Sequence, residues 1–333
     1  MSNQQPPSIV VTTIQDPTSC MKTLAQTAEK VGSKVTVVGD RKGPFEYPLE
    51  ACELLTIDDQ IEMEFELVKL LPENHYTRKN VGYLKVILEG ATFIYETDDD
   101  NAPTDWDLRS LSCEARKPDL HGWVNVYRWF SDELIWPRGL PLDTIKQEVS
   151  FEGPITEFEA PIQQGLADGS PDVDAIWRLV LDKDIKFEKR DSIVLPRGAW
   201  CPFNSQSTWW WPVAYPLMYL PSYCSFRMTD IWRSFVAQRC LWELGTGLVF
   251  HASEVHQERN VHNLQRDFEM EVDGYLQNAR IAEALENLAL EPGSDAVATN
   301  LYACYEELVK HDFFPEKELP LVSAWISDLK AIE

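Results

Sequence analysis

The chain has 333 residues, 54 of them acidic and 30 basic, and its formal net charge of -24 argues against nucleic acid or anionic lipid as partners. Hydrophobic residues make up 44% of it, enough for a globular core, yet no apolar run approaches the ~20 residues that a membrane-spanning helix requires. Its 7 cysteines are scattered and its first residues lack the features of a signal peptide, so we expect a cytoplasmic protein.

The first elements follow the order strand, helix, strand. A β-branched run from 8 to 14 predicts a buried strand, and a second apolar run from 34 to 38 predicts another. Between them, Asp16 and Pro17 supply the N-cap and the first residue of a helix that Gly32 ends. This is the crossover unit of an α/β sheet. Its first turn has no GxGxxG, so the sequence does not support an ordinary dinucleotide fold.

The next unit ends in three consecutive aspartates. After "HYTRKN", apolar spacing from 81 to 88 predicts a helix, and "ATFIYE", residues 91 to 96, predicts a strand. Asp98, Asp99 and Asp100 follow, where this strand leaves the sheet. Ligands of open α/β sheets bind outside the carboxyl ends of the strands. The aspartates are therefore candidates for a binding site.

The composition of this acidic cluster suits a divalent metal. In an extended segment Asp98 and Asp100 would point to one side and Asp99 to the other. Converging carboxylates are costly without a cation, and Mg²⁺ or Mn²⁺ binds one or two carboxylates together with phosphate oxygens. A solvated acidic turn is the alternative. A calcium loop does not fit, because its sixth and twelfth positions would be Pro103 and Arg109.

Polar residues surround the cluster in the predicted sheet. Arg78, Lys79 and Asn80 open the preceding helix, whose N-terminus favours anions, although the two basic residues could also form a solvated pair. Asp40 ends the second strand at the same edge, where it would bind a base or ribose or cap a turn. Thr13, in the first strand, is a further candidate for binding the ligand.

A second acidic stretch, "ADGSPDVDAIWRL", holds Asp168, Asp172 and Asp174. A turn followed by a helix explains it, with Asp172 near the N-cap and a surface pair between Asp174 and Arg178. The three tryptophans at 209–211 cannot all point inward from one strand or helix, so we expect at least one to be partly exposed.

Long segments spread along the chain resemble the STELLO family of glycosyltransferases. More distantly, the chain is similar to the reversibly glycosylated polypeptides, the plant UDP-arabinopyranose mutases, which share a three-aspartate motif and a segment like Asp230-Ile231-Trp232. The segments that carry the STELLO resemblance are "VVTTI", "VVGDRKGP", "LLPENHYTRKNVGYL", "IYETDDDN", "WPRGLPL", "QQGLADGSPDVDAIWRL", "PFNSQST", "FRMTDIWRSFVAQR" and "QERNVHNLQRDF".

Both resemblances imply a GT-A fold, which is an α/β protein with a Rossmann-type sheet. Helical patterns at 264–279, at 297–309 and after Pro320 predict a C-terminal helical extension to it. The predicted divisions are a disordered N-terminus (1–7), a nucleotide-sugar-binding half (8–110), an acceptor-binding half (111–262) and the helical extension (263–333).

The resemblance also implies roles by position. Asp98 and Asp100 would be the DxD pair at the ribose and at Mn²⁺ or Mg²⁺. Asp230 would deprotonate the acceptor hydroxyl, for which an ordinary aspartate suffices, and Asp168 would contact the substrate. His262 in the segment "RNVH", or its rival His256, would add a metal ligand, although a lone histidine is more often structural. The other residues expected at the nucleotide sugar are Thr13, Asp40, Arg78, Asn80 and Asp99.

Together these features predict a soluble, metal-dependent glycosyltransferase. It would transfer a sugar from a UDP-sugar to a glycan or other hydroxyl acceptor, with inversion if Asp230 is the base. A second copy or another glycosyltransferase is a candidate partner. The alternatives are a sugar-nucleotide mutase or hydrolase, a nucleotide sensor, and a non-catalytic scaffold. Ile145 stands where the mutases carry a glycosylated arginine, which argues against a mutase. STELLO proteins carry a membrane anchor ahead of the catalytic region, and here the first strand begins at residue 8.

Overall fold

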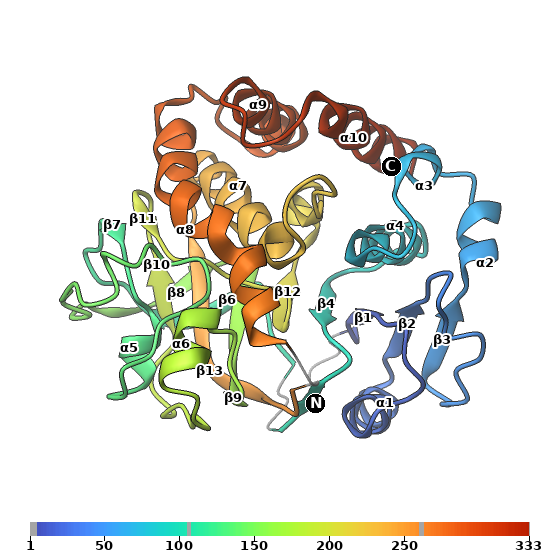
Figure 1. The fold of residues 1–333 in the computed structure, drawn as a ribbon, viewed down its shortest axis with the longest axis horizontal. Helices are drawn as coiled ribbons and strands as arrows, with labels where there is room; N and C mark the ends of the chain where they lie inside the picture. The colour runs from blue at the N-terminus through green and yellow to red at the C-terminus, as the bar shows by residue number, and fades with distance from the viewer. Residues whose placement is uncertain (1–4, 105–107, 260–262, 333) are drawn as a thin grey trace.

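The computed structural model describes residues 5–104, 108–259 and 263–332, and Figure 1 shows their fold. Residues 1–4, most of the predicted disordered segment 1–7, and His262 lie outside the described residues. The strands are β1 (Ser8–Thr12), β2 (Lys34–Val38), β3 (Cys52–Leu55), β4 (Ile94–Thr97), β5 (Asn101–Pro103), β6 (Ser112–Arg116), β7 (Gly122–Trp123), β8 (Ile155–Glu159), β9 (Ile162–Gly169), β10 (Ile193–Leu195), β11 (Ala199–Trp200), β12 (Ser207–Trp210) and β13 (Leu248–Gln257). The α-helices are α1 (Ser19–Val31), α2 (Ile57–Glu62), α3 (Glu66–Leu70), α4 (Lys79–Leu88), α5 (Tyr127–Phe130), α6 (Ala175–Val180), α7 (Thr229–Glu243), α8 (Leu264–Asn287), α9 (Val297–Lys310) and α10 (Leu319–Ile332). Short 3₁₀ helices are η1 (Tyr76–Arg78), η2 (Pro212–Met218), η3 (Phe226–Met228), η4 (Ser294–Ala296) and η5 (Glu316–Glu318).

Within the described part of the chain, 11 strands form one mixed sheet in the order β3-β2-β1-β4-β12-β9-β13-β10-β6-β8, with β5 paired to β13. Strands β3, β2, β1 and β4 are parallel, so their carboxyl ends share one edge of the sheet. Antiparallel β12 joins β4 to β9 and carries the sheet into the second half. The structure thus confirms the predicted fold class, a GT-A-like α/β protein with a Rossmann-type sheet and a C-terminal helical extension.

Helices cover both faces of the parallel strands. Ile9 and Val11 pack in one apolar cluster with α1, whereas Val10, which points the other way, packs in a second cluster with α4. Figure 1 shows these two helices on opposite sides of β1 and β2. Gly82 lets α4 approach the sheet closely, because a Cβ atom there would lie 2.7 Å from Cγ1 of Val10. Both faces of these strands are therefore buried.

The C-terminal helices bridge the two halves of the sheet. Helix α8 packs against α7, while α10 packs against α9 and reaches α3 and α4 of the first half, as Figure 1 shows. Asp328 of α10 caps α3, because its carboxylate accepts the backbone N–H groups of Glu66 and Leu67, each at 2.9 Å. None of the described helices is both long enough and apolar enough to span a bilayer.

Two sequence expectations about these elements were wrong. Helix α1 begins at Ser19, and Thr18 rather than Asp16 is its N-cap, with its hydroxyl accepting the Met21 N–H at 3.1 Å. The tryptophans at 209–211 are all buried, with exposed fractions of 0%, 0% and 7%. The expectation of an exposed ring failed because β12 lies between β4 and β9, where apolar clusters cover both faces of the sheet.

Candidate active site

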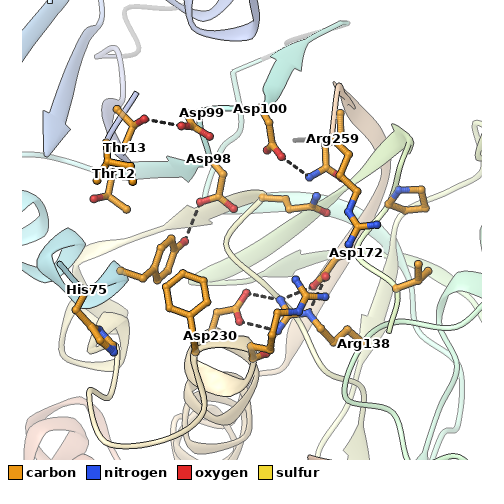
Figure 2. Close-up of a pocket in the computed structure, with 18 of the residues that line it drawn as sticks. Thr12, Thr13, His75, Asp98, Asp99, Asp100, Arg138, Asp172, Asp230 and Arg259 are labelled. Carbon is orange, nitrogen blue, oxygen red and sulfur yellow. Dashed lines mark hydrogen bonds and ion pairs between the residues drawn. The ribbon is translucent and has the colours of Figure 1, made fainter. Parts of the chain in front are cut away.

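A cavity of about 320 Å³ lies at the carboxyl ends of β1, β2 and β4. Thr12 and Thr13 line it from the end of β1, Asp40 lines it from the residues after β2, and the three aspartates at 98–100 line it after β4. Figure 2 shows Arg138, Asp172 and Asp230 of the second half on another side of it. The cavity therefore occupies the place where ligands bind in open α/β sheets.

Asp98 is held by a buried lysine. Its Oδ1 accepts hydrogen bonds from the Tyr76 hydroxyl at 2.8 Å and from Lys79 Nζ at 3.0 Å. Lys79 is 0% exposed and also donates to the carbonyl oxygen of Thr97 at 2.8 Å. Burial raises the pKa of Asp98, and the charge of Lys79 offsets part of that rise. Arg78 is also buried, so the solvated Arg78–Lys79 pair considered from sequence does not exist.

Asp99 ties this segment to the first crossover. Its carboxylate accepts a hydrogen bond from the Thr13 hydroxyl at 2.5 Å, and its carbonyl oxygen accepts one from the Thr18 hydroxyl at 2.5 Å. The segment forms a turn, in which the N–H of Asn101 donates to the carbonyl of Asp98 at 3.3 Å. The expected extended alternation is therefore wrong, and all three aspartates line the cavity.

Asp100 has the environment that a divalent cation would relieve. It is 8% exposed, and its two oxygens accept hydrogen bonds from Gln257 Nε2 and from Asn101 Nδ2, each at 2.9 Å. Burial, and then the negative charges of Asp98 and Asp99, raise the pKa of Asp100 to about 7. Carboxylate oxygens are the ligands that Mg²⁺ and Mn²⁺ prefer.

The side chains at this end of the cavity suit a divalent ion that is bound partly by the protein and partly by a nucleotide. Among the described residues, no three His, Cys, Asp or Glu side chains already form a metal site. An ion here would instead be held by Asp98 and Asp100, with phosphate oxygens and water completing its ligands.

Asp40 holds the loop at the end of the cavity where the sequence predicts the nucleotide base. Its oxygens accept the backbone N–H of Arg41 at 2.7 Å and that of His75 at 3.0 Å. It thus has the turn-capping role considered from sequence, and it also lines the cavity. His75 and Tyr76, which the sequence did not single out, line the cavity beside it. Their position in "HYTRKN", before the predicted helix, was the available signal.

Arg78 and Asn80, which were expected to contact ribose or phosphate, do not line this cavity. Arg78 donates through Nε to Gln60 at 2.8 Å, and the Asn80 side chain exchanges two hydrogen bonds, each of 2.9 Å, with the backbone of Leu220. Successive residues of a helix point about 100° apart, so the three cannot all face one site. Lys79 faces Asp98, and its neighbours face the protein interior.

We therefore expect Asn80→Ala to lower stability without changing ligand binding. The free energy of unfolding, measured in urea, should fall by about 1–3 kcal/mol, because the buried backbone groups of Leu220 lose both partners. Exposed Asn287→Ala is the matched control and should have little effect. If Asn80→Ala instead loses much of its nucleotide affinity and keeps its stability, the Asn80 side chain contacts the nucleotide.

Arg138 joins two aspartates in the second half of the site. Its Nε and Nη2 contact the two oxygens of Asp172 at 2.7 and 2.9 Å, and its Nη1 and Nη2 contact those of Asp230 at 3.1 and 3.0 Å. All three side chains are at least nine-tenths buried. Burial alone would raise the pKa of Asp230, but the charge of Arg138 outweighs it and lowers that pKa. Asp230, in the first turn of α7, is thus kept ionised.

Asp168 does not line the cavity, whereas Asp172 does. The carboxylate of Asp168 accepts the backbone N–H of Phe187 at 2.9 Å. The acidic stretch also differs from the expected surface helix. Asp174, not Asp172, caps α6 by accepting the N–H of Trp177 at 2.8 Å, and Arg178 is only 5% exposed. The turn after β9 decides which of these aspartates points inward.

The structure places His256 outside the cavity as well. It is exposed and packs against Gly169, whereas the next residue, Gln257, lines the cavity and reaches Asp100. Alternation along β13 sends these neighbours to opposite sides. His251 is buried, with its ring nitrogens 2.6 Å from Ser192 Oγ and 2.9 Å from Gln163 Oε1. His262 lies outside the described residues.

Comparison with known proteins points to one family. Residues 227–333 match the family model of the STELLO glycosyltransferases. The protein named "Probable glycosyltransferase STELLO1" from Arabidopsis thaliana is 29% identical over 350 residues, which cover 97% of this chain and 44% of that protein. "Probable glycosyltransferase STELLO2" from the same plant is 28% identical over 345 residues, covering 96% of this chain and 44% of that protein. The chain spans less than half the length of these relatives.

Proposed function

We propose that this chain, which is similar to the STELLO glycosyltransferases over nearly its whole length, transfers a sugar from a nucleotide diphosphate sugar, a UDP-sugar, to a hydroxyl acceptor. The observation that carries the proposal is the convergence of Asp98, Asp99 and Asp100 on one cavity at the carboxyl ends of parallel strands. A glycan is the acceptor class that best suits a polar cavity lined by carboxylates and arginines.

In this proposal the nucleotide lies along the first half of the cavity. Its base and ribose are placed by Thr12, Asp40 and His75, and its diphosphate lies at Asp98 and Asp100. The bond from Thr13 holds the aspartate turn in position, and Lys79 fixes the carboxylate of Asp98. A bound Mn²⁺ or Mg²⁺ would supply the charge that neutralises the departing diphosphate.

Asp230 is the proposed general base at the sugar end of the cavity. Arg138 keeps its carboxylate ionised, so it can accept the proton of the acceptor hydroxyl. Each carboxylate oxygen has two lone pairs, and Oδ2 uses one of them for Arg138. The remaining lone pair is available to the acceptor. Attack of the activated hydroxyl from the side opposite the diphosphate would invert the sugar.

Thermal unfolding with UDP, with Mn²⁺ and with both together tests the proposal. A ligand at 100 times its dissociation constant stabilises the native state by about 2.7 kcal/mol, and we expect UDP with Mn²⁺ to raise the unfolding temperature by more than the sum of their separate effects. GDP and CDP with Mn²⁺ serve as controls for base selection.

The products of turnover decide between this activity and its alternatives. UDP-sugar transfer to an added acceptor supports the proposal, and UDP release that needs no acceptor would replace it with a hydrolase. A chain that binds neither UDP nor Mn²⁺ would be a non-catalytic scaffold of the same fold.

A further inference from the structure

Four of the described residues that line the cavity are arginines, although the chain is strongly acidic. Figure 2 shows Arg138 and Arg259 on the side of the cavity away from Thr12, Thr13 and His75. The other two are Arg178 and Arg227. On the proposed function, this is the side that receives the transferred sugar and the acceptor, because it holds Asp230.

Three of these arginines have carboxylate partners within the protein. Arg138 pairs with Asp172 and Asp230. Arg227 contacts Glu271 at 2.8 Å, and Arg259 contacts Asp267 at 3.0 Å. Their charges are therefore largely balanced before any ligand binds, so none of them by itself indicates an anion.

Arg178 differs from the other three. Among the described residues it has no carboxylate within ion-pair distance, and its hydrogen bond from Nη2 goes to the carbonyl oxygen of Pro171 at 2.6 Å. Its Nε is buried without a partner, and the whole residue is only 5% exposed although it lines the cavity. A buried guanidinium that contacts no carboxylate is costly, and the nearby Asp172 and Asp182 act on it only from beyond ion-pair distance. Arg178 can therefore accept an anion from a ligand.

The neighbouring arginines increase that cost. Burial, and then the positive charge of Arg259, lower the pKa of Arg178 to about 10; the charges of Asp172 and Asp182 offset part of this effect, and Arg227 adds to it. A ligand anion placed at Arg178 would relieve both the missing hydrogen bonds and the mutual repulsion. The planar guanidinium also matches the two oxygens of a carboxylate.

We propose that Arg178, flanked by Arg227 and Arg259, binds the carboxylate of an acidic sugar carried by either the donor or the acceptor. The inference rests on the proposed function, which places the donor diphosphate at Asp98 and Asp100 and leaves the arginine side for the sugars. It narrows the substrate class from any sugar to one that carries a uronate group.

Two binding series, read by calorimetry with Mn²⁺, test the inference and separate the two sources of the carboxylate. The donor series compares UDP-glucuronate with UDP-glucose. The acceptor series compares glucuronate with glucose on protein saturated with UDP. We expect the acidic ligand to bind about 10- to 100-fold more tightly than the neutral one in one series, the range that a charged hydrogen-bonded pair supports.

Variants of Arg178 assign the preference to that side chain. Arg178→Gln should bring the acidic and neutral ligands within about twofold of each other, leaving the affinity for UDP unchanged. Arg178→Lys, which keeps the charge but loses the planar fork, should retain part of the preference. The matched control is Arg280→Gln on the exposed face of α8, which should behave as the wild type.

Three results would overturn the inference. If the wild type binds UDP but does not distinguish acidic from neutral sugars in either series, the uronate subsite is refuted and the proposed function stands. If Arg178→Gln weakens UDP and every UDP-sugar equally, the arginine binds the diphosphate instead. If the wild type does not bind UDP at all, the proposed function fails and the inference fails with it.

Discussion

Asp100→Asn will weaken Mn²⁺-dependent UDP binding by more than about 100-fold while leaving the metal-free protein at least as stable as the wild type. Asp100 is buried beside Asp98 and Asp99, and burial together with these charges raises its pKa to about 7. Removing its charge should increase the free energy of unfolding without metal by something on the order of 1 kcal/mol. The Gln257 side chain can rotate its amide to present oxygen to the new Asn, so its hydrogen bond need not be lost.

The loss of binding follows from the same charge. Loss of a residue that only hydrogen-bonds to a metal ligand lowers metal affinity by about 10- to 100-fold. Loss of a carboxylate that binds the metal directly should cost more, so we expect the affinity for UDP with Mn²⁺ to fall by more than about 100-fold. Calorimetry of UDP with Mn²⁺ and urea unfolding in chelator measure the two effects. Asp119→Asn, at an exposed side chain, is the matched control and should change neither. If Asp100→Asn binds UDP with Mn²⁺ as tightly as the wild type does, Asp100 is not a ligand of the metal.

Arg138→Met will be the most destabilising of the changes considered at this site. It leaves Asp172 and Asp230 buried side by side without their cation, and breaking a buried pair in this way costs about 3–5 kcal/mol. Urea unfolding at pH 7.5 should show the loss. The exposed Arg280→Met serves as the control, because it removes the same charge without uncovering a buried carboxylate.

The dependence of this loss on pH identifies its cause. In the wild type, Arg138 lowers the pKa of Asp230, so the stability that the ionised carboxylate contributes is present at neutral pH and disappears only as the pH falls through that lowered value. Without Arg138, burial should raise the pKa of Asp230, and protonation of this carboxylate should restore stability as the pH falls from about 7 to 4. Arg138→Met combined with Asp230→Asn should recover part of the loss at pH 7.5. If Arg138→Met is destabilised by the same amount at about pH 7 and about pH 4, lost packing and not the uncompensated charge is the cause.

Local patterns along the chain were enough to place the aspartate cluster. Four elements lead to Asp98: β1, β2, α4 and β4. Each is shorter than a dozen residues, and most of its apolar residues are buried. Because parallel strands deliver their carboxyl ends to one edge, the position of the cluster in the fold followed from that order. The C-terminal helices were predictable for the same reason, since their apolar spacing is also local.

The direction of individual side chains did not follow from these patterns. Arg78, Lys79 and Asn80 are consecutive and equally polar, yet only Lys79 contacts the cluster. Asn80 is directed elsewhere by Leu220, which lies 140 residues away in the chain. Likewise, Asp172 rather than Asp168 lines the cavity because of how the chain turns after β9.

The sequence by itself determined the strands β1, β2 and β4 and the acidic cluster at their edge, because apolar spacing is encoded in neighbouring residues. Only the tertiary structure decided the cationic side of the cavity. Arg138 and Asp230 are 92 residues apart and form a pair because the sheet and α7 bring them together. Arg178 faces Arg227 and Arg259 for the same kind of reason, since these two arginines come from segments distant in the chain. Charge balance in a buried site depends on which residues the fold brings into contact, and composition does not record that.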